Sequence, residues 1–195
     1  MVHINKKIIS FVMAFVCAVT MSVCFISSAE TADAKDIQTQ TWDYLINAGC
    51  SPAAAAGIMG NIEQESSFNP RCGGSHKGLF QISRYHMRKL KKVARRNGTK
   101  WYDVETQLEY GTKYMSSEIK IYTRYDWNRF KKLKSPAKAA KVWERGVERA
   151  GCPMMGNRIK YAKKYYRMFK DRQVPADSGE HVSGIRTQKS VIKQL

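Results

Sequence analysis

The segment between Ser51 and Pro70 constrains the fold of this chain more than any other part of the sequence. A serine followed by a proline is a strong helix start, because serine caps the first amide groups and proline fits the first helical position. Pro70 moves the residue before it out of helical geometry, so it ends the helix. Between these signals lies the run AAAAGIMGNIEQES. It predicts a helix over residues 52–66.

Both sides of this predicted helix are suited to packing. One side is an apolar stripe, made up of Ala55, Ile58, Met59, Ile62 and Ser66. The opposite side is rich in small residues and consists of Ala53, Gly57, Gly60 and Gln64. Small residues let a second helix approach closely. We therefore predict that this helix is central to the domain and is covered on two sides.

The rest of the chain also predicts helices rather than strands. The apolar spacing is helical from residue 41 to about residue 169, and turn residues separate the segments. The predicted helices span residues 39–48, 52–66, 84–97, 103–120, 136–149 and 157–170. With 195 residues, of which 43% are hydrophobic, the chain suits one domain with a packed core. The predicted fold class is mainly α, in one domain over residues 35–170.

The N-terminus has the pattern of an export segment. Two lysines at positions 6 and 7 precede an apolar run over residues 8–29, and the small residues Ala32-Asp33-Ala34 follow. This order is typical of a secretory signal peptide, and the run is also long enough to span a bilayer. We predict that residues 1–34 are a signal peptide or an N-terminal membrane anchor. The domain is then secreted or lies at the cell surface.

Two polar segments flank the predicted domain. Residues 30–37 are predicted to form a short linker. Residues 171–195 contain few core-forming residues, so they are predicted to be a mobile tail.

The chain is strongly basic, with 34 Lys and Arg against 16 Asp and Glu and a formal net charge of +18. An excess of this size predicts an anionic partner. For an exported chain, an anionic wall polymer such as teichoic acid or a membrane surface fits better than nucleic acid. The sequence has no readable helix-turn-helix or zinc motif, so no nucleic-acid partner is predicted.

The five cysteines form no metal-binding pattern. No Cys-x-x-Cys occurs and the four histidines are scattered, so no metal or other cofactor is predicted. Cys17 and Cys24 lie in the N-terminal apolar run, which leaves Cys50, Cys72 and Cys152. One disulfide is expected in an oxidising compartment, and the turn-like polar surroundings of Cys72 and Cys152 favour this pair. Cys50 is predicted to be a small buried residue.

Glu65 lies near the end of the predicted central helix, at the edge of its apolar stripe. Partial burial and the negative end of the helix dipole both disfavour a charged carboxylate there. Glycoside cleavage requires a carboxylic acid that keeps its proton near neutral pH, because the leaving oxygen must be protonated. The alternative is a structural glutamate that caps a loop or pairs with a basic residue.

Two motifs around this glutamate resemble those of the lysozyme-like superfamily. They are Glu-Ser-Ser-Phe-Asn-Pro over residues 65–70 and Gly-Leu-Phe-Gln-Ile over residues 78–82. They are similar to motifs of lytic transglycosylases and goose-type lysozymes, and the chain most closely resembles the phage-tail-type lysozyme family. Further matching segments lie, in order, at residues 55–62, 101–110, 143–149 and 158–162. The resemblance covers residues 38–170 and implies a lysozyme-like helical domain whose central buried helix carries the catalytic glutamate.

The resemblance also implies roles for single residues. It makes Glu65 the catalytic acid and places Gln81 in the lining of the glycan cleft. Phe80, which lies beside Gln81, and Tyr161 are predicted to touch the glycan. Ser75 lies in the loop where the transglycosylases use a serine beside the substrate, but this loop is shorter here.

The implied activity is cleavage of peptidoglycan between N-acetylmuramic acid and N-acetylglucosamine, by a muramidase or a lytic transglycosylase. A muramidase uses a second carboxylate to activate water, for which Asp103, Glu109 and Glu148 are candidates. In a transglycosylase the deprotonated Glu65 activates the 6-hydroxyl of the sugar and gives an anhydro product. Glu148 matches a glutamate in a Glu-Arg-Pro segment of the family, but Pro153 comes three residues too late. The single matched glutamate favours the transglycosylase reaction.

A second class of function stays open. A non-catalytic wall-binding or envelope-assembly module could have the same fold and the same cleft. The chain is predicted to be a monomer, and its sequence does not distinguish wall turnover from a phage or conjugation role.

Overall fold

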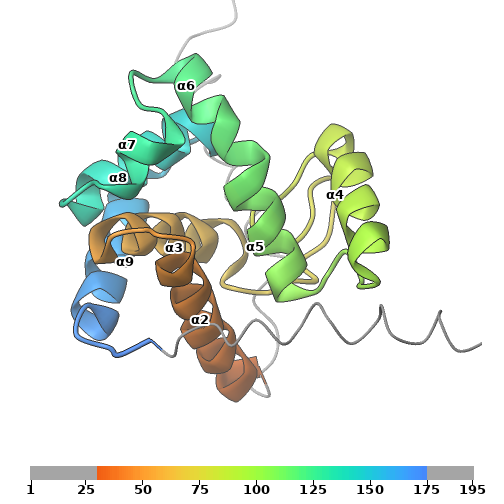
Figure 1. Ribbon diagram of the computed structural model, residues 1–195, viewed down its shortest axis with the longest axis horizontal. Helices are drawn as coiled ribbons and strands as arrows, with labels where there is room; N and C mark the ends of the chain where they lie inside the picture. The colour runs from red at the N-terminus through yellow and green to blue at the C-terminus, as the bar shows by residue number, and fades with distance from the viewer. Residues whose placement is uncertain (1–29, 175–195) are drawn as a thin grey trace, which may run out of the picture.

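The computed structural model describes residues 30–174, with side chains from residue 36 onward. It is mainly helical (Figure 1), so the predicted fold class is confirmed. The helices are α2 (Glu30–Asn47), α3 (Pro52–Ser66), α4 (Arg84–Asn97), α5 (Val104–Lys113), η2 (Met115–Glu118), α6 (Ile119–Tyr122), α7 (Trp127–Lys131), α8 (Pro136–Trp143), η3 (Glu144–Glu148) and α9 (Met155–Phe169). Within the described residues, η2 is a 3-10 helix, η3 is a π-helix, and the β pairing is a single bridge between Lys77 and Ile82.

Helix α3 lies at the centre of the fold, packed against α8 and α9, and α2 also contacts it (Figure 1). A Cβ atom added at Gly57 would lie 2.8 Å from Ala140 N of α8. A Cβ atom added at Gly60 would lie 2.6 Å from Ala162 N of α9. The backbone of α8 beside Gly57 and that of α9 beside Gly60 leave no room for a larger residue. Both positions therefore require glycine. The predicted central helix, covered on two sides, is confirmed.

An aromatic cluster fills the core around the end of α8. The ring centroid of Trp143 lies 5.6 Å from that of Phe130 and 5.9 Å from that of Phe80. Trp127 stacks on Phe130 with a centroid distance of 5.6 Å. Aromatic side chains bury large apolar areas, so this cluster contributes strongly to hydrophobic stabilisation beside α3.

Local signals set the ends of the helices that were predicted correctly. The predictions for residues 52–66 and 84–97 are confirmed by α3 and α4. Ser51 Oγ accepts a hydrogen bond from Ala54 N at 3.1 Å, which caps α3. Gly98 ends α4 with a left-handed φ of 70°. These caps depend on neighbours in the sequence, which is why the pattern locates them.

Helix α2 is longer than predicted, and helix α7 was not predicted. Helix α2 begins at Glu30 and runs through residues 30–37, so the predicted linker there is wrong. Ala, Glu and Lys in this segment are good helix formers, and polar composition alone does not exclude a helix. The short helix α7 was not predicted, although Asp126 caps it by accepting from Arg129 N at 2.8 Å.

The helix predicted over residues 103–120 is interrupted. The α-helical part ends at Lys113, and η2 and α6 follow in a different geometry. The hydroxyl of Thr112 donates to Leu108 O, and that of Ser116 donates to Thr112 O. Such bonds from serine and threonine to carbonyls one turn earlier bend helices.

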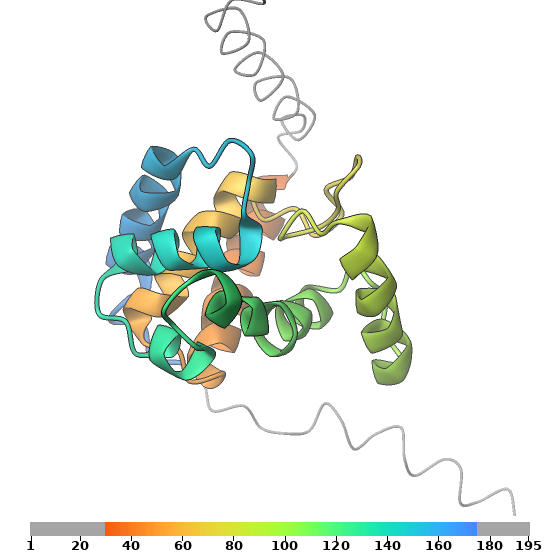
Figure 2. The same cartoon turned by 90° about the horizontal axis from the view of Figure 1, so that it is seen from above.

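Helix α4 and the segment that leads to it lie to one side of the other helices (Figure 2). Helix α5 is the main neighbour of α4. The buried stripe of α4 consists of Met87, Leu90, Val93 and Ala94. Its exposed side chains are mostly basic, whereas His86 and Asn97 are half-buried.

The predictions for the two chain ends fall mostly outside the described residues. This applies to the export segment over residues 1–34 and to the mobile tail over residues 171–195. Within residues 30–174, no helix has the length and apolar character needed to cross a membrane.

Candidate functional site

Glu65 lies in the last turn of α3, where the chain leaves the helix in an uncommon conformation. Ser67 and Phe68 have positive φ angles of 50° and 63°. Such angles are unfavourable for residues other than glycine and persist only where surrounding contacts hold them. Phe68 is 1% exposed, and its ring centroid lies 5.4 Å from that of Tyr165. The core therefore holds the turn that follows Glu65.

Hydrogen bonds join the two motif segments. Ser66 Oγ donates to Leu79 O at 3.0 Å. The buried side chain of Gln107 accepts from Leu79 N at 2.7 Å and donates to Pro70 O at 2.8 Å. Gly78 has a φ of 75°, and a Cβ atom there would collide with the Gln107 side chain. Gln107 thus holds the Gly-Leu-Phe-Gln turn against the end of α3.

Arg158 of α9 forms an ion pair with Glu65. Its Nη2 donates to Glu65 Oε1 at 2.6 Å, its Nη1 to Asn61 Oδ1 at 3.0 Å, and its Nε to Pro153 O at 2.6 Å. The side chain of Arg158 is 2% exposed and that of Glu65 is 16% exposed. A buried guanidinium needs such partners, because an unpaired charge in the interior is strongly unfavourable. Glu65 is therefore ion-paired and still partly open to solvent.

An irregular helix brings Glu148 to the same place. The helix predicted over residues 136–149 is α-helical only as far as Trp143 and continues as the π-helix η3. Arg149 N donates to Glu144 O at 2.7 Å across this π-turn. Trp143 Nε1 donates to Glu148 Oε1 at 2.8 Å and so orients the carboxyl. π-turns are rare and often occur at functional sites.

The carboxyl of Glu148 has a raised pKa. Burial, followed by the negative charge of Glu65, raises the pKa of Glu148 to about 8. The charge of Arg158 and the hydrogen bond from Trp143 oppose this rise. A raised pKa of the kind that glycoside cleavage requires is thus found at Glu148.

Gln81, Tyr161 and Ser75 are described by the structure, and their predicted contacts with the glycan stay predictions. Gln81 is half-buried, has a positive φ of 42°, and donates from Nε2 to Gly78 O at 3.0 Å. Tyr161 is half-buried on α9. Ser75 is exposed in its loop, and its hydroxyl lies 3.0 Å from His76 Nδ1.

Phe80 belongs to the core instead of the glycan cleft. It is 1% exposed, and its ring packs beside Trp143. On another side, a Cβ atom added at Gly111 would lie 2.8 Å from the Phe80 ring. A ring enclosed in this way presents no face to a sugar, so the predicted glycan contact of Phe80 is wrong.

The predicted disulfide between Cys72 and Cys152 is also wrong. Cys72 is disulfide-bonded, whereas the thiols of Cys50 and Cys152 are free. Polar turn surroundings do not report the distance between two cysteines, and a disulfide needs Cα atoms within about 7 Å. Cys50 is buried as predicted, and burial raises the pKa of its thiol to about 12.

The described part of the chain offers no metal centre. Within residues 36–174, no group of three His, Cys, Asp or Glu side chains could hold a metal ion.

No role was predicted for Arg158, although the sequence carries a signal for it. Arg158 shares the buried stripe of α9 with Ala162, Tyr165 and Phe169. A charged residue in register with an apolar stripe needs a buried partner. That partner, Glu65, lies 93 residues away on another helix, and helical spacing gives no information at that distance.

A comparison with known protein families gives a match. The family model described as phage tail lysozyme matches residues 36–169. The match includes the motif turn, the π-turn and the helix that carries Arg158. No curated protein matches the chain.

Proposed function

We propose that this chain, which belongs to the phage tail lysozyme family, cleaves the glycan strands of peptidoglycan between N-acetylmuramic acid and N-acetylglucosamine. Membership of the family implies lytic action on peptidoglycan in general, and such action takes place outside the cytoplasm. The bond, the catalytic residue and the product are our proposal. The observation that carries it is the meeting of Glu65, Glu148 and Arg158 at the end of α3.

Glu65 is proposed to be the general acid and base. It follows the family motif, lies beside a turn held by the core, and is 16% exposed, so a bound glycan can reach it. Glu65 then protonates the glycosidic oxygen while positive charge develops on the sugar ring.

Arg158 and Glu148 are proposed to act through Glu65. The hydrogen bond from Arg158 orients the Glu65 carboxyl and stabilises the carboxylate that forms when the proton leaves. Glu148 keeps its proton at neutral pH, so it adds no second negative charge to oppose that carboxylate. Both are positioning residues in this scheme, because neither touches the reacting atoms.

An anhydro product fits this arrangement better than hydrolysis. In hydrolysis a second carboxylate takes a proton from water, and a protonated Glu148 cannot do so at neutral pH. The Glu65 carboxylate instead takes the proton of the muramic acid 6-hydroxyl. This oxygen attacks the anomeric carbon, which closes the anhydro ring and returns the proton to Glu65. Mass spectrometry of the digest should therefore show anhydro ends, and intact reducing ends would contradict this route.

Replacing Glu65 by glutamine tests the proposal. Glu65→Gln removes the transferable proton, so lysis of purified peptidoglycan should fall by about 100-fold or more in a zymogram and in a turbidity assay. Glu63→Gln on the same helix is the matched control. Glu63 accepts a hydrogen bond from Tyr165 at 2.7 Å, which glutamine can keep, so its lysis should stay close to that of the parent.

The outcome also decides between the two classes of function. A Glu65→Gln variant that lyses walls as well as the parent would contradict the proposal. The chain would then be a non-catalytic wall-binding or envelope-assembly module with this fold. Export through residues 1–34 and a monomeric state stay predictions in either case.

A further inference from the structure

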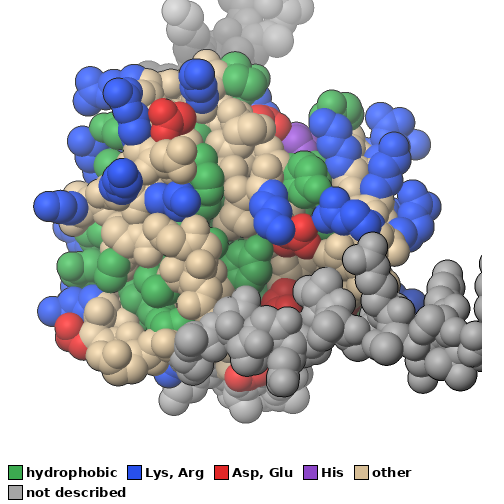
Figure 3. Space-filling view, viewed as in Figure 1, with side chains coloured by type: hydrophobic (Ala, Val, Ile, Leu, Met, Phe, Trp, Pro, Cys, Tyr) green, Lys and Arg blue, Asp and Glu red, His purple; other side chains and the backbone are tan. Residues whose placement is uncertain are grey.

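A cationic pocket lies between the end of α6 with the segment that follows it and the helices α8 and η3, and the proposed lytic mechanism makes no use of it. Its volume is about 370 Å³. Among its eight described lining residues are four basic and two tyrosine side chains, Arg124, Lys138, Lys141, Arg145, Tyr122 and Tyr125. Figure 3 shows the blue basic side chains that gather over this part of the molecule, at the upper left, and over α4 at the right.

Among the described residues, no carboxylate forms an ion pair with any of the four basic side chains of the pocket. None of the eight described lining residues is acidic. Like charges around one hollow repel each other and concentrate a positive potential in it. A bound anion would offset this repulsion.

Cations lie near both tyrosine rings of the pocket. Arg149 Cζ lies 4.2 Å from the ring centroid of Tyr122. Lys138 Nζ and Arg124 Cζ lie 5.5 Å and 5.7 Å from the ring centroid of Tyr125. Lys138, followed by Arg124, also lowers the pKa of Tyr125 by hydrogen bonding to its hydroxyl. With four basic side chains around the hollow and cations near both rings, we expect the ligand to be recognised mainly by its negative charge.

We propose that this pocket binds the phosphodiester groups of a polyol-phosphate polymer of the cell wall. Arginine presents a planar fork that matches phosphate oxygens, and lysine adds compact positive charge. The choice of a wall polymer rests on the proposed function, because a peptidoglycan-cleaving protein meets phosphate polymers where it works. The pocket would then hold the chain on the wall while the glycan is cut elsewhere on the molecule.

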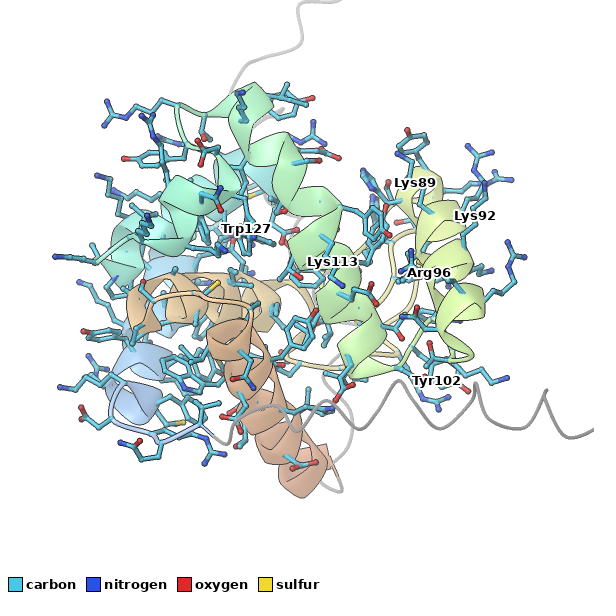
Figure 4. All side chains as sticks on the ribbon, viewed as in Figure 1. Lys89, Lys92, Arg96, Tyr102, Lys113 and Trp127 are labelled. Carbon is cyan, nitrogen blue, oxygen red and sulfur yellow. The ribbon has the colours of Figure 1, made fainter. Side chains whose placement is uncertain are left out.

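Helix α4 supplies a matched control, because it is at least as basic as the pocket. Seven of its 14 residues are Lys or Arg. Lys89, Lys92 and Arg96 lie along this helix at the edge of the molecule (Figure 4). If charge alone binds the polymer, a lysine on α4 should contribute as much to the binding affinity as a lysine in the pocket.

Two double variants separate these explanations at equal net charge. Lys138→Gln/Lys141→Gln removes two exposed lysines from the pocket, and Lys91→Gln/Lys92→Gln removes two exposed lysines from α4. The full chain is titrated with a fluorescently labelled glycerol-phosphate oligomer, and binding is read by fluorescence anisotropy at physiological salt. The pocket variant should bind at least about tenfold more weakly, and the α4 variant should stay within about twofold of the parent.

Three results would overturn the proposal. Equal weakening in both variants would show that diffuse charge binds the polymer. A labelled single-stranded oligonucleotide with the same number of phosphates serves as the competing ligand. If it binds the parent more tightly than the oligomer does, and the pocket variant loses this binding, the partner is nucleic acid. Absence of saturable binding of the oligomer would show that the pocket is not a binding site for it. Glu65→Gln should bind the oligomer like the parent, so a failure of the lytic proposal is seen in lysis and not in this titration.

Discussion

At the scale of single residues, Arg158 organises the candidate site. Its three hydrogen-bonding groups reach Asn61 and Glu65 on α3 and Pro153 in the segment before α9. A guanidinium with 2% exposure has lost nearly all of its hydration, so these acceptors must compensate for that loss. The same contacts hold Glu65 in one orientation, which links the stability of the domain to the geometry of its proposed acid.

Arg158→Met should lower the free energy of unfolding by about 3–5 kcal/mol, because it leaves a partly buried carboxylate without its ionic partner. Urea unfolding followed by circular dichroism measures this loss. The double variant with Glu65→Gln should cost less than the sum of the single variants, since it removes both charges. Arg167→Met, at an exposed position of the same helix, should change stability by less than about 0.5 kcal/mol. A loss below about 1 kcal/mol in Arg158→Met would refute the role given to the ion pair.

At the scale of helices, the close approach of α3 and α9 brings the two halves of the site together. Gly60 is the point of contact, since its missing side chain leaves room for the backbone at Arg158 and Ala162. This contact lies about one turn from Glu65 along α3. A wider spacing between the helices would lengthen the hydrogen bond between Arg158 and Glu65.

Gly60→Ala should therefore destabilise the protein by about 1–3 kcal/mol and reduce lysis, because the added methyl group pushes α9 away from α3. Gly156→Ala is the control, since a Cβ atom there meets nothing within 4 Å. Alanine has the higher helix propensity, so this change in α9 should stabilise the protein by about 0.5–1 kcal/mol. Thermal unfolding of both variants measures the difference. Equal melting temperatures would contradict close packing at Gly60.

At the scale of the whole molecule, Glu148 makes folding stability depend on pH. Its pKa rises from about 4.5 in the unfolded chain to about 8 in the folded protein. Between these two values the folded state binds one more proton than the unfolded state. The stabilisation is fully present below pH 4.5 and is lost as the pH rises toward 8. The slope from one such group is about 1.4 kcal/mol per pH unit.

Glu148→Gln should remove this slope, because glutamine does not titrate. Urea unfolding of the parent and the variant at pH values from 5 to 8 measures it. The pKa of His86 is lowered, mainly by burial. At pH values below the ordinary pKa of histidine, this shift makes stability rise with pH, opposite to the effect of Glu148. His86 is present in both proteins, so its effect cancels in the difference between them. Parallel stability curves would show that Glu148 is ionised in the folded protein at neutral pH.

The parts of the fold that could be predicted are those that depend on neighbours in the sequence. Ser51, Pro52 and Pro70 defined α3 through capping and steric exclusion, and the small residues of α3 indicated close helix packing. The same local information placed Glu65 at the end of this helix. It failed for residues 30–37, because helix propensity and linker composition overlap in polar segments.

The sequence by itself therefore determined a mainly helical domain, its central helix and the position of Glu65 in the last turn of that helix. Only the tertiary structure decided that Glu65 pairs with Arg158, that burial beside Glu65 raises the pKa of Glu148, and that Cys152 stays free. The physical reason is distance along the chain. Caps and apolar stripes act within a few residues, whereas ion pairs, burial and disulfides depend on how segments far apart in the sequence pack together.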